Sequence, residues 1–151
     1  MKRKFLTLAF LALGTTAFVS CSDDDDETVI NAQELPENAQ TFVSTHFPAA
    51  DYTKIEKKQA AESDGTLYEV ELSNNFEIDF TAEGEWVDID GNNSEVPVEI
   101  IPENIAGYVT ENYTDLFITG IDKEPTGYEI NLSNDLDVYF DQDENFVREE
   151  Q

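Results

Sequence analysis

Two stretches of the chain share one helical spacing of apolar positions. Residues 35–47 read LPENAQTFVSTHF, and residues 101–113 read IPENIAGYVTENY. Pro36 and Pro102 stand where a first helical turn accepts proline, because the N–H there has no partner. The apolar positions recur three or four residues apart and are Ala39, Phe42, Val43 and Phe47 in the first stretch and Ile105, Tyr108, Val109 and Tyr113 in the second. This spacing predicts two helices, each with one apolar stripe.

After each helical stretch, apolar and polar residues alternate. The sequences YEVEL, FEIDF and WVDID place an acid between successive apolar side chains, and Asn74-Asn75 and Gly84 supply turns. Such alternation predicts antiparallel hairpins with one apolar and one acidic face. The predicted strands are residues 53–57, 68–72, 76–80 and 86–90 in the first half and residues 128–132 and 136–140 in the second.

The two halves match residue by residue. At an offset of 66, Leu35, Pro36, Phe42, Thr53, Ile55 and Lys57 meet Ile101, Pro102, Tyr108, Thr119, Ile121 and Lys123. At an offset of 60, Tyr68, Leu72, Phe80, Trp86 and Val87 meet Tyr128, Leu132, Phe140, Phe146 and Val147. The change of offset falls in the polar stretch KQAAESDG, where a loop tolerates a change of length. The chain is therefore an internal duplication of a unit of about sixty residues.

The duplication predicts an α+β fold of two tandem repeats, each with one helix packed on an antiparallel sheet of about four strands. The helix stripe must cover the apolar sheet face, because neither is stable in contact with water. A unit of this size has a marginal core, so we expect the units to pack together in one continuous sheet. The expected divisions are a signal peptide (1–20), an acidic tether (21–33), the first repeat (34–90), a linker (91–99) and the second repeat (100–151).

The first residues are typical of an export signal. Lys2, Arg3 and Lys4 precede an apolar run over residues 5–19, which is too short to span a membrane. Phe18-Val19-Ser20-Cys21 resembles a bacterial lipobox, with Phe18 where Leu is usual. We predict lipidation of Cys21, the only cysteine, and an outer-membrane lipoprotein on the cell surface or the periplasmic face. The alternative is an ordinary signal peptide followed by an unmodified thiol.

Charge narrows the classes of partner. The run Ser22-Asp-Asp-Asp-Asp-Glu27 predicts a solvated tether. The chain has 8 Lys+Arg against 34 Asp+Glu, and removal of the three N-terminal cations changes its net charge from −26 to −29. Such a surface excludes nucleic acid and anionic lipid as electrostatic partners, so membrane contact is expected only through Cys21. The partners that fit this charge are a basic protein or a divalent cation.

The repeats resemble the PepSY-like family, which is also called β-lactamase-inhibitor-like. The resemblance is carried by LPENAQTFVSTHFPAADYTKIEK and YEVELSNNFEIDFTAEGEW, and the second copy departs from it at Thr114, Glu144 and Phe146. Both copies together cover residues 34–150. The resemblance implies a secreted or lipid-anchored bacterial protein that binds another protein, such as a hydrolase, through an open sheet face. It implies no catalytic group.

No pair of nucleophile and base is evident in the sequence. His46 is the only histidine, and its place at the end of a predicted helix favours a packing or capping role. Two turns, Asp88-x-Asp90-x-Asn92 and Asp141-x-Asp143-x-Asn145, have the opening spacing of a calcium loop. Asn93 and Phe146 stand where that loop requires glycine, so acid-rich hairpin turns are the preferred interpretation and no metal site is assigned.

The acidic sheet face is the candidate binding surface, although a merely solvated face is the alternative. The carboxylates expected together on it are Glu69, Glu71, Glu77 and Asp79, and the aromatic candidates are Trp86, Tyr139 and Phe146. Paired carboxylates can also serve glycosidases, but no cleft is indicated here. We predict a non-enzymatic, cofactor-free, lipid-anchored envelope protein that binds an unidentified protein. The alternative is an accessory domain that binds calcium weakly.

Overall fold

The computed structural model describes residues 27–151. The predicted signal peptide and the lipidation site Cys21 lie outside the described residues. The helices are the 3₁₀ turn η1 (Ala32–Glu34), α1 (Glu37–His46) and α2 (Glu103–Asn112). The strands are β1 (Glu27–Val29), β2 (Tyr52–Lys58), β3 (Tyr68–Leu72), β4 (Glu77–Phe80), β5 (Trp86–Asp90), β6 (Ile118–Glu124), β7 (Gly127–Leu132), β8 (Asp137–Asp141) and β9 (Phe146–Glu150).

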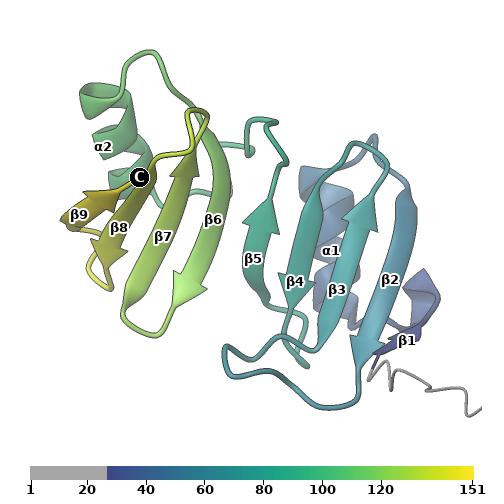
Figure 1. Ribbon diagram of the computed structural model, residues 1–151. Coiled ribbons are helices and arrows are strands. Elements are labelled where there is room, and N and C mark those ends of the chain that lie inside the picture. Colours follow the sequence, from purple (N-terminus) through teal and green to yellow (C-terminus); the bar gives the residue numbers. More distant parts are fainter. Residues whose placement is uncertain (1–26) are drawn as a thin grey trace, which may run out of the picture.

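All strands of the described chain belong to one antiparallel sheet of nine strands, in the order β1 to β9 (Figure 1). The two repeats meet where β5 pairs with β6, with Ile89 opposite Ile121 and Asp88 opposite Asp122. The prediction of an α+β fold with a continuous sheet is thereby confirmed.

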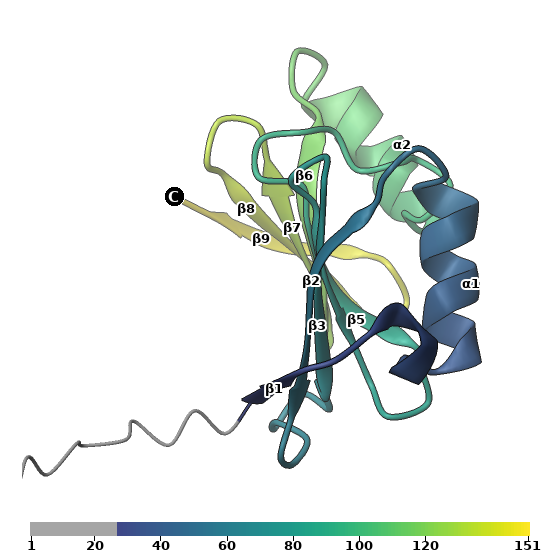
Figure 2. The same ribbon diagram turned by 90° about the vertical axis from the view of Figure 1, so that its right-hand side faces the viewer.

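Both helices cover the same face of the sheet (Figure 2). Their apolar stripes supply Ala39 and Val43 from α1 and Ile105 and Val109 from α2, all of which are buried. The strands contribute their alternate apolar residues to the same core, as expected for a two-layer fold. These buried strand residues are Ile55, Tyr68, Val70, Leu72, Ile78, Phe80, Ile89, Ile118, Ile121, Ile130, Leu132, Val138 and Phe140.

The strand registers of the two repeats correspond pair by pair. Ile55 lies opposite Val70 in the first repeat, and Ile121 lies opposite Ile130 in the second. The irregularities also recur, because the register shifts between β2 and β3 as it does between β6 and β7, and between β4 and β5 as between β8 and β9. The duplication therefore holds for the fold as well as for the sequence.

The sequence did not predict the elements before α1. Glu27–Val29 forms β1, which pairs with β2 although it lies within the predicted tether, and η1 (Ala32–Glu34) spans the predicted boundary between the tether and the first repeat. Lys57 and Lys58 on β2 lie opposite Thr28 and Glu27, so a basic strand end attracts part of the acidic segment. The helices also begin at Glu37 and Glu103, each directly after the proline that was expected to be its first residue.

The turn before β5 supports the start of α1. Gly84 has a φ of +79°, and a Cβ at this position would lie 2.8 Å from the Ala39 backbone nitrogen. In the second repeat, Glu144 occupies the equivalent position with a φ of 63° and accepts a hydrogen bond of 2.8 Å from Asn104. The first turn thus has less space than the second.

Because the two turns differ in space, substitutions at Gly84 and Glu144 should have unequal effects on the free energy of unfolding. Gly84→Ala should lower the free energy of unfolding by about 2 kcal/mol, because it adds both backbone strain and a steric clash. Glu144→Gly should change it by less than about 0.5 kcal/mol, since relief of the positive φ is offset by the greater freedom of the unfolded chain. Urea unfolding of both variants measures this, and equal losses would contradict the account of the turn.

Candidate functional site

The sheet face opposite the helices carries a row of acidic side chains that crosses both repeats. Cross-strand pairs join Glu56 to Glu69, Glu69 to Asp79, Asp88 to Asp122, and Asp122 to Glu129. Across the irregular β4–β5 pair, the charge of Asp88 contributes to the raised pKa of Asp79. We call the set Glu56, Glu69, Asp79, Asp88, Asp122 and Glu129 the carboxylate row. Directly opposite side chains in a sheet lie about 5 Å apart, so these charges repel one another.

The centre of the carboxylate row has no directly paired cation, and the charge of Lys58 only partly offsets the rise in the pKa of Asp79. Burial, and then the charges of Glu69 and Asp88, raise the pKa of Asp79 to about 7. Burial, and then Asp122 and Asp90, raise the pKa of Asp88 to about 7. Burial, followed by Glu124 and Glu129, raises the pKa of Asp122 to about 6. Within residues 27–151, no Lys or Arg forms an ion pair with these three aspartates.

A second row runs beside the first. Glu71 lies opposite Glu77, and Glu77 lies opposite Asp90. This second row begins with Lys54 on β2, and in the second repeat its positions are occupied by the uncharged residues Gly120 and Asn131. A depression of about 190 Å³ between β2 and β5 is lined by both rows and includes Glu69, Glu71, Glu77, Asp79, Asp88 and Asp90. The strongest concentration of carboxylates therefore lies on the first repeat.

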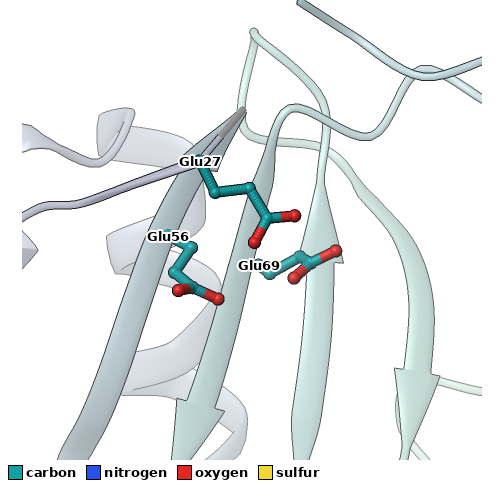
Figure 3. A group of neighbouring side chains, drawn as sticks. All are labelled: Glu27, Glu56 and Glu69. Carbon is teal, nitrogen blue, oxygen red and sulfur yellow. The ribbon is translucent and has the colours of Figure 1, made fainter. Parts of the chain in front are cut away.

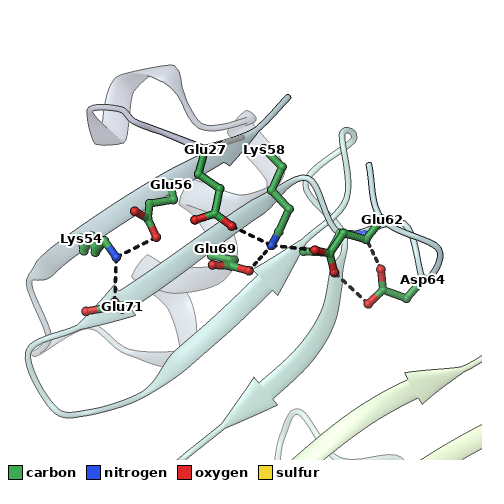
Figure 4. A network of polar contacts seen from close by, with 9 residues as sticks. Glu27, Lys54, Glu56, Lys58, Glu62, Asp64, Glu69 and Glu71 are labelled. Atoms are coloured by element: carbon green, nitrogen blue, oxygen red, sulfur yellow. Dashed lines mark hydrogen bonds and ion pairs between the residues drawn. The ribbon is translucent and has the colours of Figure 1, made fainter. Parts of the chain in front are cut away.

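The edge of the open face differs from its centre because lysines neutralise it (Figure 4). The Nζ atom of Lys58 lies 3.2 Å from Glu27 and 2.9 Å from Glu62, and it also contacts Glu69. Burial by itself lowers the pKa of Lys58, but the hydrogen bonds to these three carboxylates raise it above its ordinary value. Lys54 lies 2.7 Å from Glu56 and 3.6 Å from Glu71.

Three of these carboxylates also have the spacing of a metal site. Ligand atoms of Glu27, Glu56 and Glu69 lie within 4.8 Å of one another (Figure 3). The ammonium of Lys58, however, contacts two of the three and supplies the positive charge that a metal would bring. The group fits an internal ion-pair network better than a metal centre.

The network predicts a large effect of removing its buried cation. Lys58→Gln should lower the free energy of unfolding by about 2–3 kcal/mol, because it leaves several carboxylates without a counter-charge. Lys57→Gln makes the same change of net charge at the neighbouring exposed position and should cost less than about 0.5 kcal/mol. Chemical unfolding of the two variants measures the difference, and similar losses would mean that the ion pairs do not stabilise the fold.

Most of the predicted binding residues lie where the alternation placed them. Glu69, Glu71, Glu77 and Asp79 meet on the open face and line its depression. Tyr139 lies opposite Glu129 on the same face, and the guanidinium carbon of Arg148 is 3.6 Å from the centre of its ring. The roles of these residues in binding stay predictions.

The prediction that Trp86 and Phe146 belong to the open face is wrong, because both side chains lie on the helix side of the sheet. The Trp86 ring is 6.5 Å from that of Phe42 on α1, and Phe146 stacks on Tyr108 of α2 at 5.0 Å. The register shift in the β4–β5 pair places Trp86 opposite Phe80, which changes the phase of the alternation. The equivalent register shift in the β8–β9 pair places Phe146 opposite Phe140. Trp86 packs against the core, whereas Phe146 is 40% exposed.

The remaining candidates have local structural roles. The Asp141 carboxylate accepts backbone hydrogen bonds from Asp143 and Asn145, and Asp90 accepts one from Asn92, as in ordinary turns. His46 is the last residue of α1, and its ring lies 4.6 Å from that of Phe42. Neither Asp88 nor Asp122 was predicted to lie on the candidate binding surface, because only the β5–β6 pairing brings them together.

Comparison with known proteins identifies the family. The family described as "Putative beta-lactamase-inhibitor-like, PepSY-like" matches residues 23–77 and 66–148. Curated proteins gave no match. None of the helices in residues 27–151 has the length and apolar character that crossing a membrane requires.

Solved structures of similar proteins come from Bacteroides. A putative periplasmic protein of the DUF2874 family from Bacteroides vulgatus is 30% identical with a TM-score of 0.76, covering 85% of this chain and 99% of that one. A second B. vulgatus protein, of unknown function and also described as periplasmic, is 31% identical with a TM-score of 0.77, covering 83% and 99%. A putative calcium-regulated periplasmic protein from Bacteroides thetaiotaomicron is 31% identical with a TM-score of 0.78, covering 84% and 98%. The chain belongs to the PepSY-like family and contains two units of it.

Proposed function

We propose that this chain is a non-enzymatic cell-envelope protein, anchored by a lipid on Cys21, that binds a basic segment of another protein on its open acidic face. The observation that carries the proposal is the centre of the carboxylate row, where Asp79, Asp88 and Asp122 have raised pKa values and no ion-pair partner among residues 27–151. A basic partner would supply the counter-charge that the described chain lacks there. The periplasmic descriptions of the similar structures support the location.

The geometry of the row suits an extended cationic segment. Neighbouring strands are about 4.8 Å apart, so the row presents one carboxylate per strand. In an extended segment, alternate side chains project to one side about 6.6 Å apart, which allows each Lys or Arg to reach at least one carboxylate. Charge-assisted contacts of this kind weaken as salt concentration rises.

Calorimetric titration with a short peptide of alternating Lys and Ser tests the proposal. The wild-type protein should bind the peptide with an affinity that falls at least about tenfold when salt is raised from about 0.05 to 0.2 M. The control variant Glu111→Gln/Asp115→Asn removes two negative charges away from the open face, because both residues are exposed on or just after α2. This variant should retain binding of the peptide. The proposal would be contradicted if the wild-type protein did not bind the peptide at low salt, or if the control variant lost its binding.

Calcium binding is a second candidate function. The similar B. thetaiotaomicron protein is described as calcium-regulated, and Glu71, Glu77 and Asp90 form adjacent pairs on the open face. Calcium takes six to eight oxygen ligands, so these carboxylates would need water or backbone oxygens as well. An open site of this type would bind calcium weakly.

Calcium titration followed by calorimetry separates the two functions. For the calcium function, the wild-type protein should bind Ca²⁺ at about millimolar concentration or below, and Glu77→Gln should weaken this binding about tenfold or more. Glu111→Gln serves as the matched control. No heat of binding up to several millimolar Ca²⁺ would reject calcium binding and leave the peptide experiment unaffected.

A further inference from the structure

The two ends of the sheet expose edge strands that are related by the internal duplication. In the first repeat, β5 is followed in the sheet by β6 of the second repeat. The equivalent of β5 in the second repeat is β9, which has no strand on its outer side in the described chain. The equivalent of β6 in the first repeat is β2, whose outer side carries only the three-residue β1.

Apolar side chains at the β9 edge are exposed, whereas Val87 at the internal junction is buried. Val87 on β5 is 4% exposed, whereas the equivalent Val147 on β9 is 56% exposed. Phe146, the counterpart of Trp86, is 40% exposed. An exposed strand edge with apolar side chains favours pairing with a further strand.

The register of the internal junction predicts which residues would meet if β9 paired with β2 of a second copy. At the junction, Asp88, Ile89 and Asp90 lie opposite Asp122, Ile121 and Gly120. The equivalent residues of β9 are Arg148, Glu149 and Glu150, and those of β2 are Glu56, Ile55 and Lys54. Arg148 would therefore face Glu56, and Glu150 would face Lys54. Both pairs on the open face join opposite charges, whereas the internal pair Asp88–Asp122 joins like charges.

A third correspondence lies on the helix side. Lys123 on β6 donates a hydrogen bond of 3.0 Å to the Trp86 carbonyl oxygen, and its Nζ lies 3.5 Å from the centre of the Trp86 ring. The counterparts are Lys57 on β2 and Phe146 on β9. The same cation–π contact would therefore form between copies, where it would cover the exposed Phe146.

From these correspondences we propose that copies of this chain associate head to tail, with β9 of one copy paired antiparallel to β2 of the next in the register of the β5–β6 junction. The occupant of the β9 edge is thus a second copy. The contact joins different surfaces of the two copies, so it leaves one β9 edge and one β2 edge available at the ends of each assembly. Association can then continue beyond a dimer.

β1 competes for the edge that this contact uses. Val29 lies opposite Glu56, and the Ile30 N–H donates a 2.9 Å hydrogen bond to the Ile55 oxygen. The predicted intermolecular register covers Lys54 to Glu56, so the end of β1 must move away from β2. All three residues of β1 are exposed, but moving the strand would also break the Glu27–Lys58 ion pair. β1 therefore competes with the association.

Sedimentation velocity over a concentration series, at about 0.15 M salt and with a reductant to prevent disulfides through Cys21, tests the proposal. The sedimentation coefficient of the wild-type protein should rise with concentration and pass the value for a dimer. Thr28→Pro should strengthen association at least about fivefold, because proline removes a β1 ladder donor. If the wild type and Thr28→Pro both remain monomeric up to about 1 mM, a concentration that detects even weak contacts, the proposal is overturned.

A charge swap identifies the contact itself. Arg148→Glu and Glu56→Arg should each weaken association about tenfold or more, because each places like charges opposite one another. The double variant Arg148→Glu/Glu56→Arg should recover most of the loss. These residues lie on opposite ends of the sheet, so recovery cannot arise within one copy. A double variant as weak as the singles, with thermal unfolding that shows it to be folded, would overturn the proposed register.

Discussion

Replacing Asp79 and Asp88 together by asparagine is expected to stabilise the protein and to weaken its binding to a basic peptide. At pH 8 both carboxylates are ionised although burial and their acidic neighbours oppose this, as their pKa values of about 7 indicate. Asparagine has nearly the same shape and no charge. After allowance for screening by solvent, we expect the free energy of unfolding to rise by about 2 kcal/mol. Peptide affinity should fall about 10- to 100-fold, which corresponds to about 1.4–2.8 kcal/mol.

Two measurements on this variant are needed together. Urea unfolding reports the stability, and calorimetry with the Lys-Ser peptide reports the affinity. The control Glu111→Gln/Asp115→Asn removes the same number of charges away from the open face and should change neither quantity by much. A variant that loses both stability and binding would indicate that the two aspartates hold the fold, and this would contradict a binding role for the row.

Stability is expected to fall as pH rises from about 5 to 8. In this range the folded protein retains protons on Asp79, Asp88 and Asp122 that the unfolded chain has already released, since their folded pKa values of about 7, 7 and 6 exceed the ordinary 3.8. The folded state thus binds more protons, so the free energy of unfolding decreases with rising pH. Because these groups interact and are partly exposed, we expect a total change on the order of 2 kcal/mol.

Thermal unfolding at pH 5, 6, 7 and 8 measures this dependence. The melting temperature should be about 4–8 °C higher at pH 5 than at pH 8. Asp79→Asn/Asp88→Asn should show a flatter profile, because two of the responsible groups are gone. A wild-type melting temperature that rises between pH 5 and pH 8 would show that the carboxylates of the open face are compensated in the folded state.

The alternation of residues was sufficient to predict the sheet and its acidic face. The strand over 86–90 was predicted with the bounds that it has, and the helices differ by one residue at their starts. The carboxylates Glu69 and Asp79 face outward because a period of two residues leaves no other choice once Val70 and Ile78 are buried. Both helices lie on the apolar face of the sheet, as predicted, because their apolar stripes are stable only when they are buried against it.

What the sequence did not reveal depends on contacts between segments. A register shift in the β4–β5 pair changes which face Trp86 occupies, and no residue type marks such a shift in advance. β1 has no alternation to indicate a strand, and its pairing with β2 includes an ion pair between Glu27 and Lys58 that the sequence alone does not reveal. Asp88 and Asp122 become neighbours only through the pairing of β5 with β6, which joins the two repeats.

Mapping of backbone amide chemical shifts by NMR during titration with the Lys-Ser peptide tests most directly whether the open face is the binding surface. Binding on the open face should change the shifts of β3, β4, β5, β6 and β7, with the changes centred on Asp79, Asp88 and Asp122 and with α1 and α2 unchanged. Changes centred on the two helices, or an absence of changes at peptide concentrations that saturate the calorimetric signal, would contradict it.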